Sequence, residues 1–109
     1  MFLSPYRIMW IFVMFDLPTG SKSERKNATE FRAGLLDLGF EMSQYSVYLK
    51  YCASGDKALA VSKRVKGLIP NGGKVDIFTI TDKQFGAMER FYGKNTNKNK
   101  GKPNQLVLF

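Results

Sequence analysis

Blocks of apolar and polar residues divide this chain into short strands and helices. The longest apolar run covers residues 8–15 (IMWIFVMF) and stops at an Asp-Leu-Pro sequence that begins with Asp16. A short apolar run that ends at such a breaker predicts a strand buried on both faces of a sheet. We therefore expect Trp10 and Phe12 in the protein core, and Asp16 at the tip of a rigid strand.

Two segments have the spacing of amphipathic helices. The first begins at Ser21 or Ser23, either of which can cap the first turn, and ends at Gly39. Its apolar positions, spaced 3, 4 and 3, form one stripe: Ala28, Phe31, Leu35 and Leu38. The second helix opens at residues 54–56 and directs Ala58, Val61, Val65 and Leu68 inward. A Pro-Asn-Gly-Gly sequence at residues 70–73 closes it.

The remaining segments predict strands and turns. Residues 40–51 are expected to form two strands joined by a tight link at 43–45. In the second of these, Val47, Leu49 and Tyr51 alternate with Ser46, Tyr48 and Lys50, which is typical of a half-buried strand. A fourth strand is expected at residues 75–81, followed by a turn at 82–85, and residues 87–92 are a candidate fifth strand.

The order strand, helix, strand, strand, helix, strand predicts an α+β, ferredoxin-like βαββαβ fold with an antiparallel sheet. Two helices would cover one face. The fourth strand is apolar on both sides, so we expect a second copy of the chain to cover part of the other face.

Residues 1–93 would form this domain, and residues 94–104, rich in Asn, Lys and Gly, a basic flexible linker. The last five residues would form a strand that docks on a partner subunit or partner protein: Gln105, Leu106, Val107, Leu108 and Phe109. Folding back onto the chain's own sheet is the alternative.

Composition narrows the class of function. With 109 residues the chain is one domain, and 17 basic against 9 acidic side chains give a net charge of +8. Such a charge favours a polyanionic partner, usually nucleic acid, although solubility alone is the competing explanation. The absence of histidine excludes His-based acid–base catalysis and His-ligated metal sites, and one cysteine cannot form an internal disulfide. The apolar run is too short to span a membrane, so we expect an intracellular protein.

Asp16 is the candidate metal ligand because a rigid strand holds its carboxylate beside a loop. The cations Lys22, Arg25 and Lys26 follow on the start of a helix, and a fixed carboxylate beside cations suits a metal ion with a phosphate backbone. The competing interpretation is that Asp16 only ends a strand and opens a turn. Arg32 is a further candidate nucleic-acid contact. Three tyrosines, Tyr45, Tyr48 and Tyr51, could stack on bases, although packing is their favoured role.

An ordered set of short motifs resembles a known family. The set runs from Phe-Asp-Leu-Pro at residues 15–18 and Arg-Lys at 25–26 to a terminal Leu-Val-Leu-Phe. Between them come Phe31-Arg32, Gly39-Phe40, Gln44, Ser46-Val47-Tyr48 and Asp82-Lys83-Gln84-Phe85. In this order and spacing the chain is similar to the second CRISPR-associated protein, a small adaptation protein often described as an endoribonuclease, in its type II form. The resemblance covers residues 8–109.

The resemblance implies a ferredoxin-like homodimer in the bacterial cytoplasm. Family members bridge two dimers of the CRISPR integrase and help to capture foreign DNA for spacer acquisition. They have been described as nucleases that cleave single-stranded RNA or double-stranded DNA with Mg²⁺, and Mn²⁺ is a second candidate cofactor. By this resemblance Asp16 is the catalytic, metal-binding residue, and Lys22, Arg25 and Lys26 contact phosphates. The segment before the first strand, residues 1–7, departs from the pattern and has no assigned role.

Scaffolding requires less of these residues than catalysis. A two-fold symmetric basic protein can hold DNA through sequence-independent phosphate contacts, whereas each chain offers one carboxylate for hydrolysis. We therefore favour a DNA-binding scaffold with metal-dependent endonuclease activity as a secondary property. A toxin-type messenger ribonuclease on the same fold is the alternative, and a dimeric protein-binding module without nucleic acid is a third possibility.

Overall fold

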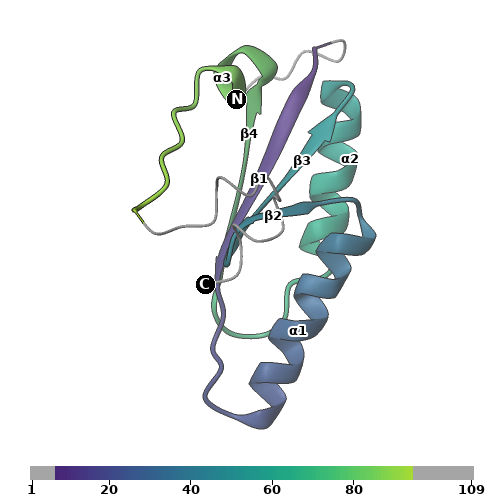
Figure 1. Cartoon of the computed structure of the whole chain (residues 1–109). Coiled ribbons are helices and arrows are strands. Elements are labelled where there is room, and N and C mark those ends of the chain that lie inside the picture. Colours follow the sequence, from purple (N-terminus) through teal and green to yellow (C-terminus); the bar gives the residue numbers. More distant parts are fainter. Residues whose placement is uncertain (1–6, 95–109) are drawn as a thin grey trace.

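The computed structural model describes residues 7–94, and they form one sheet with two long helices on one side (Figure 1). The elements are β1 (Met9–Asp16), α1 (Lys22–Asp37), β2 (Glu41–Gln44), β3 (Val47–Cys52), α2 (Gly55–Lys66), β4 (Lys74–Thr81) and α3 (Asp82–Gly86). The sheet order is β2-β3-β1-β4, and every neighbouring pair is antiparallel. This is the predicted ferredoxin-like α+β arrangement.

Local signals set the ends of α1. The Ser21 hydroxyl accepts a hydrogen bond from the Glu24 amide at 3.1 Å, and the Glu24 carboxylate accepts one from the Ser21 amide at 2.9 Å. This reciprocal pair is a capping box, so Ser21 rather than Ser23 begins the helix. At the other end Gly39 has a φ of +93°, a left-handed conformation that glycine adopts at little cost.

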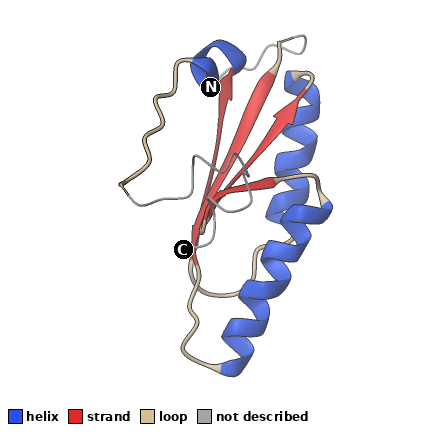
Figure 2. Ribbon diagram, in the orientation of Figure 1, coloured by secondary structure: helices blue, strands red, loops and turns tan. Residues whose placement is uncertain are grey.

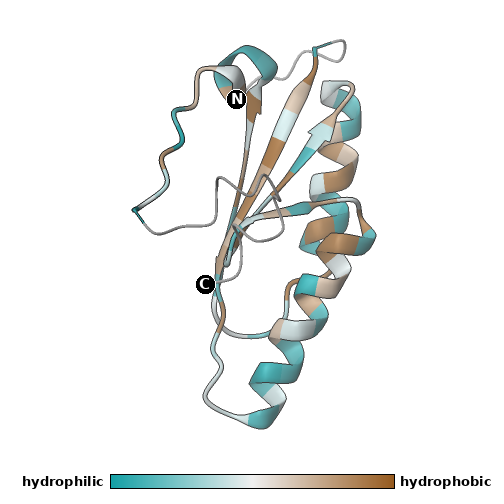
Figure 3. Ribbon diagram, in the orientation of Figure 1, coloured by the Kyte–Doolittle hydropathy of each residue, from teal (hydrophilic) through white to brown (hydrophobic). Residues whose placement is uncertain are grey.

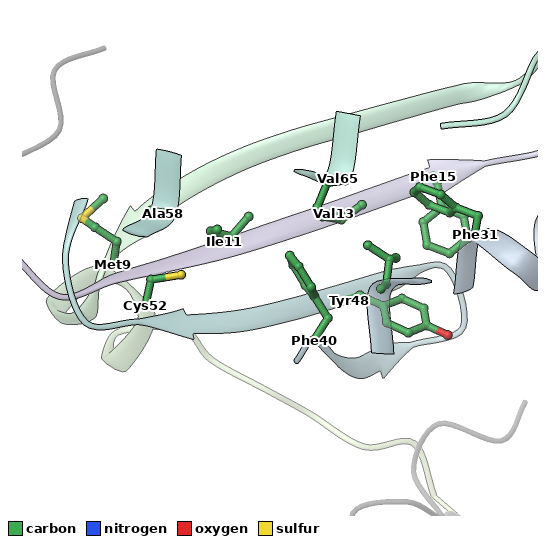
Figure 4. Packing of buried hydrophobic residues seen from close by; sticks show 11 residues of the cluster. Met9, Ile11, Val13, Phe15, Phe31, Phe40, Tyr48, Cys52, Ala58 and Val65 are labelled. Atoms are coloured by element: carbon green, nitrogen blue, oxygen red, sulfur yellow. The ribbon is translucent and has the colours of Figure 1, made fainter. Parts of the chain in front are cut away.

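The core lies between the sheet and the two helices α1 and α2 (Figure 2). From β1, alternate residues point into it: Met9, Ile11, Val13 and Phe15. The helices contribute Phe31, Leu35, Ala58 and Val65, while β3 contributes Tyr48 and Cys52 (Figure 4). Ala28 of α1 is buried as well. The predicted stripe of α1 is therefore confirmed. Leu68, predicted on the second helix, lies beyond its end, because α2 stops at Lys66.

The opposite side of the sheet, which we call the open face, carries a second set of apolar side chains. Register and alternation place these residues on it: Trp10, Phe12, Met14, Asp16, Val47, Leu49, Tyr51, Lys74, Asp76, Phe78 and Ile80. The prediction that both Trp10 and Phe12 belong to the core was wrong for Trp10, which is half-buried on this face. Phe12 is buried as predicted, at 8% exposure, but it lies on the open face rather than against the helices. Successive residues of a strand point to opposite faces, and Met9, Ile11, Val13 and Phe15 take the side facing the helices. Full burial of β1 on both faces was also wrong, because Met14 is 41% exposed.

The segment after β4 differs from the prediction in two ways. Residues 82–86 form a short helix, α3, rather than a simple turn, because the Thr81 hydroxyl caps the Gln84 amide at 3.1 Å. Residues 87–92 form no strand; they continue along the side of the open face in Figure 2. Arg90 donates a hydrogen bond from Nη2 to the Ser43 hydroxyl at 3.3 Å, which ties this segment to β2.

Several predicted features lie outside the described residues. These are the lead-in at residues 1–6, the linker from residue 95 onward and the docking strand at 105–109. Within residues 7–94, no helix is both long and apolar enough to cross a membrane.

Candidate functional site

Asp16 is the last residue of β1, and its exposed side chain lies at one end of the open face. Within residues 7–94 its carboxylate has no hydrogen-bond or ion-pair partner. The backbone around it is tightly packed: a Cβ at Gly73 would lie 2.7 Å from the Asp16 carbonyl oxygen and 3.0 Å from the Leu17 Cα. The strand and the glycine loop thus fix the Asp16 backbone while the carboxylate stays free.

The edge strand β4 brings two further charges to this end of the open face. Lys74 lies opposite Asp16 in the antiparallel pair, and Asp76 lies opposite Met14. Lys74 Nζ is 3.8 Å from Asp76 Oδ2, and both side chains are exposed, so this ion pair adds little stability. Asp16 therefore has a cation opposite it and a second carboxylate diagonal to it. Neither residue could be predicted at this site, because strand register is not visible in a single sequence.

The predicted phosphate contacts lie beyond the sheet. Lys22, Arg25 and Lys26 are exposed on the first turns of α1, which begins past the end of β1 in Figure 1. This part of the helix is strongly hydrophilic in Figure 3. Arg25 donates from Nη1 to the Thr19 carbonyl at 3.1 Å, so it also holds the loop that follows Asp16. The three cations thus lie on the first turns of α1, and Arg25 connects them to the loop that follows the strand tip.

Arg32 is half-buried and packs against two aromatic rings. Its guanidinium lies 5.4 Å from the centre of the Phe15 ring and 4.6 Å from the centre of the Tyr45 ring. Its Nε atom is buried and has no hydrogen-bond partner. Nearby Tyr48 is buried, and burial raises the pKa of its hydroxyl, with the Arg32 charge acting in the opposite direction. Contact of Arg32 with nucleic acid stays a prediction, and no motif in the sequence indicates its pairing with the two rings.

One chain supplies limited metal ligands. Within residues 7–94, no three or more side chains of His, Cys, Asp or Glu gather where they could hold a metal ion. Magnesium requires fewer than three protein ligands, since it usually keeps several waters and takes one or two carboxylates. The free, exposed Asp16 carboxylate fits that requirement as a single ligand, and Asp76 on the next strand is the nearest second carboxylate on the same face.

Aromatic rings form a row across the open face. Trp10 meets Tyr51 edge-on, with 5.6 Å between the ring centres, and stacks on Phe85 of α3 with 3.8 Å between them. Phe12 stacks on Phe78, with ring centres 5.1 Å apart. α3 therefore covers one end of the row. At the other end Met14 and Phe78 remain exposed beside Asp16, so the acidic strand tip borders an uncovered apolar surface.

Comparison with known proteins agrees with this architecture. The sequence model of the family described as "CRISPR associated protein Cas2" matches residues 9–88, from the start of β1 to just beyond α3. The chain belongs to the Cas2 family. A Cas2 relative from Flavobacterium psychrophilum is 50% identical over 107 residues, which is 98% of this chain and 93% of that protein. A relative from Paracidovorax avenae is 48% identical and covers 98% of this chain and 99% of that protein.

Both Cas2 relatives carry the name "CRISPR-associated endoribonuclease Cas2". A solved structure titled "Crystal structure of cas2" aligns with a TM-score of 0.54 at 18% sequence identity, over 81% of this chain and 92% of that one. At this identity the alignment supports the fold alone. The family resemblance drawn from the short motifs is thus confirmed, and so is the fold.

Proposed function

We propose that this Cas2 protein is a homodimeric CRISPR adaptation scaffold that binds double-stranded DNA and bridges integrase dimers during spacer acquisition. Metal-dependent cleavage of nucleic acid by Asp16 is a secondary activity, in keeping with the endoribonuclease name of its relatives. The supporting observation is the open face of the sheet, where exposed apolar side chains end at an unpartnered carboxylate.

The open face favours a second copy as its cover. Contiguous apolar surface on a monomer marks an interaction site, and two-fold symmetric dimers use one self-complementary patch. Met14 and Phe78 would lie in that interface, and each Asp16 would lie near its border. A dimer built in this way would bring a second Asp16 carboxylate to the metal site, in addition to the one that each chain offers.

The site's chemistry follows from the charges. A magnesium or manganese ion held by Asp16 would polarise a phosphodiester and lower the pKa of a bound water. Lys22 and Lys26, which are exposed on the protruding end of α1, would bind the phosphate backbone of arbitrary DNA without reading its sequence. The net charge of +8 strengthens this attraction.

The outer edge of β4 supports the bridging role. The sheet order places β4 at one edge, and within the described residues no strand pairs with its outer side. An exposed edge offers free backbone groups to an added strand. We propose that residues 105–109 of one chain dock as such a strand on a partner, either the second copy or the integrase.

The first test is the oligomeric state. Phe78→Asp places a charge in the proposed interface and should convert a dimer into a monomer in sedimentation equilibrium at micromolar concentration. Leu59→Asp is the control, because Leu59 is also an exposed large apolar residue but lies on α2, away from the open face. If the unchanged protein is a monomer, or if Phe78→Asp stays dimeric, the proposed dimer is wrong.

The second test separates scaffolding from cleavage. Asp16→Ala should abolish metal-dependent cleavage and leave duplex DNA binding, co-elution with the integrase and spacer insertion in cells intact. Loss of insertion in this variant would reverse the ranking of the two roles. Nothing in the described residues or in the relatives favours the toxin-type messenger ribonuclease. Efficient cleavage of messenger RNA, without any salt-sensitive binding of duplex DNA, would support that alternative.

A further inference from the structure

Tyr45 is an exposed aromatic residue in a tight turn. It occupies the two-residue connection between β2 and β3 and is 56% exposed. Turns of this kind favour small or polar residues, so folding of the hairpin does not by itself require a large ring here. The position is therefore a candidate for a binding role.

One face of the Tyr45 ring is supported by a cation. The Arg32 guanidinium lies 4.6 Å from the ring centre, at cation–π distance. The same guanidinium lies against the Phe15 ring. The centre of the Phe15 ring is 5.1 Å from that of Phe31, which it meets edge-on, and 5.6 Å from that of Tyr48. Phe31 and Tyr48 are fully buried, so they fix the position of the Phe15 ring. Arg32 packs between Phe15 and Tyr45 and therefore connects the Tyr45 ring to the core.

Arg32 has a feature that packing does not explain. Its Nε atom is buried without a hydrogen-bond partner, and such atoms are rare in native proteins because they cost free energy. This cost is consistent with a site that fixes the orientation of the Tyr45 ring rather than one that maximises stability.

The turn lies beside the strand that carries the proposed metal ligand. The Phe15 amide donates a hydrogen bond to the Ser46 carbonyl at 3.1 Å, which joins the residue before Asp16 to the residue after Tyr45. A nucleotide bound at Tyr45 would thus lie at the same end of the sheet as Asp16.

We propose that the outer face of the Tyr45 ring is a stacking platform for an unpaired nucleobase. A fixed aromatic ring supported by a cation suits stacking on any base, and the positive charge of the chain attracts the attached phosphates. Stacking requires an unpaired base, so this platform selects single-stranded nucleic acid. The inference rests on the proposed nucleic-acid function and adds to it a residue that binds an unpaired base.

The test measures single-stranded and duplex affinity in parallel. A single-stranded oligonucleotide with one 2-aminopurine should lose fluorescence on binding, because stacking quenches this base. Tyr45→Ala should weaken single-strand binding at least about fivefold, since one stacked base contributes 1–3 kcal/mol, and leave blunt duplex affinity unchanged. Tyr45→Phe should retain both affinities, because the ring remains.

Phe91→Ala is the matched control. Phe91 is 82% exposed, and no cation–π contact supports its ring among the described residues, so its loss should leave both affinities unchanged. A direct measurement on the unchanged protein does not depend on any variant. Irradiation with a 5-iodouracil oligonucleotide should give an adduct on Tyr45, located by mass spectrometry.

The inference and the proposed function fail in different ways. If Tyr45→Ala leaves single-strand affinity unchanged, or if the adduct forms only on other aromatic residues, the platform is wrong while the scaffold stands. An equal loss of single-strand and duplex affinity in Tyr45→Ala also overturns it. If the unchanged protein binds no duplex DNA but stacks a base on Tyr45, the scaffold is wrong and the platform stands.

Discussion

The indole N–H of Trp10 donates a hydrogen bond of 2.8 Å to Asp82 Oδ1, across 72 residues of sequence. The Asp82 amide in turn donates to the Ile8 carbonyl at 3.3 Å, and Phe85 stacks on the indole. A five-residue helix cannot persist by its own hydrogen bonds. α3 is therefore held in place by the start of β1, and it decides how much of the open face remains available.

Removal of the Phe85 ring should expose Trp10. Phe85→Ala should shift the tryptophan emission to longer wavelength, because water reaches the face of the indole that the ring now covers. Trp10 is the only tryptophan in the chain, so the emission reports this site directly. Phe91→Ala should leave the emission unchanged, and an unchanged emission in Phe85→Ala would contradict the stacked arrangement.

Gly73→Ala should destabilise the fold. Gly73 has a φ of +78°, and an added Cβ would lie 2.7 Å from the Asp16 carbonyl oxygen. Backbone strain alone should lower the free energy of unfolding by about 1–3 kcal/mol, measured by urea denaturation. Gly86→Ala is the control, because its added Cβ would meet no atom within 4 Å. Equal stability of the two variants would show that the glycine loop does not pack on β1.

Neighbouring leucines of α1 should differ sharply in their effect. Leu35 is fully buried in the core, whereas Leu36 is 54% exposed. Leu35→Ala should reduce the free energy of unfolding by about 2–5 kcal/mol, through lost burial and a residual cavity. Leu36→Ala should change it by no more than about 0.5 kcal/mol. A similar loss in both variants would mean that α1 presents a different face to the sheet.

Stability should fall at alkaline pH. Burial raises the pKa of the Cys52 thiol above its ordinary value, although Lys50 and Lys57 partly oppose this. As pH rises above that ordinary value, the thiol of the unfolded chain ionises first, which stabilises the unfolded state relative to the fold. The free energy of unfolding from this group should be constant below that pH and decrease above it. Cys52→Ala should reduce the slope, and an unchanged slope would show that the thiol does not contribute.

The helices and the strand order were predictable because their signals are local. Ser21 and Glu24 form the capping box that the start of α1 needs, and Gly39 ends the helix with a positive φ. The stripe of α1 follows from helical spacing, which depends only on neighbours in sequence. The order of strands and helices then limits the fold to few alternatives.

The assignment of sheet faces was not predictable from such signals. β1 and β3 carry apolar residues on both sides, so alternation does not decide which set meets the helices. In β3 the core receives Tyr48 and Cys52, while Leu49 lies on the open face. α3 was missed although Thr81 and Gln84 form a capping box, because five residues are too few to show a helical period and the contact with Trp10 is distant in sequence.

The candidate site was predictable only in part. The position of Asp16 at the tip of a strand follows from where the apolar run stops, and the structure confirms it. Its neighbours Lys74 and Asp76 depend on the register between β1 and β4. The contacts of Arg32 with Phe15 and Tyr45 depend on the packing of α1 against the sheet, which no short motif encodes.

The first turns of α1 extend beyond the sheet, so the residues that would attract a polyanion are separate from the residues that build the core. The first buried residue of the helix is Ala28, so Lys22 and Lys26 contribute nothing to the core. Charge can therefore be gained or lost at these positions without endangering the architecture. Affinity for a polyanion, and the salt dependence of that affinity, can therefore change independently of thermal stability. Directed evolution of either property should start at the first turns of α1.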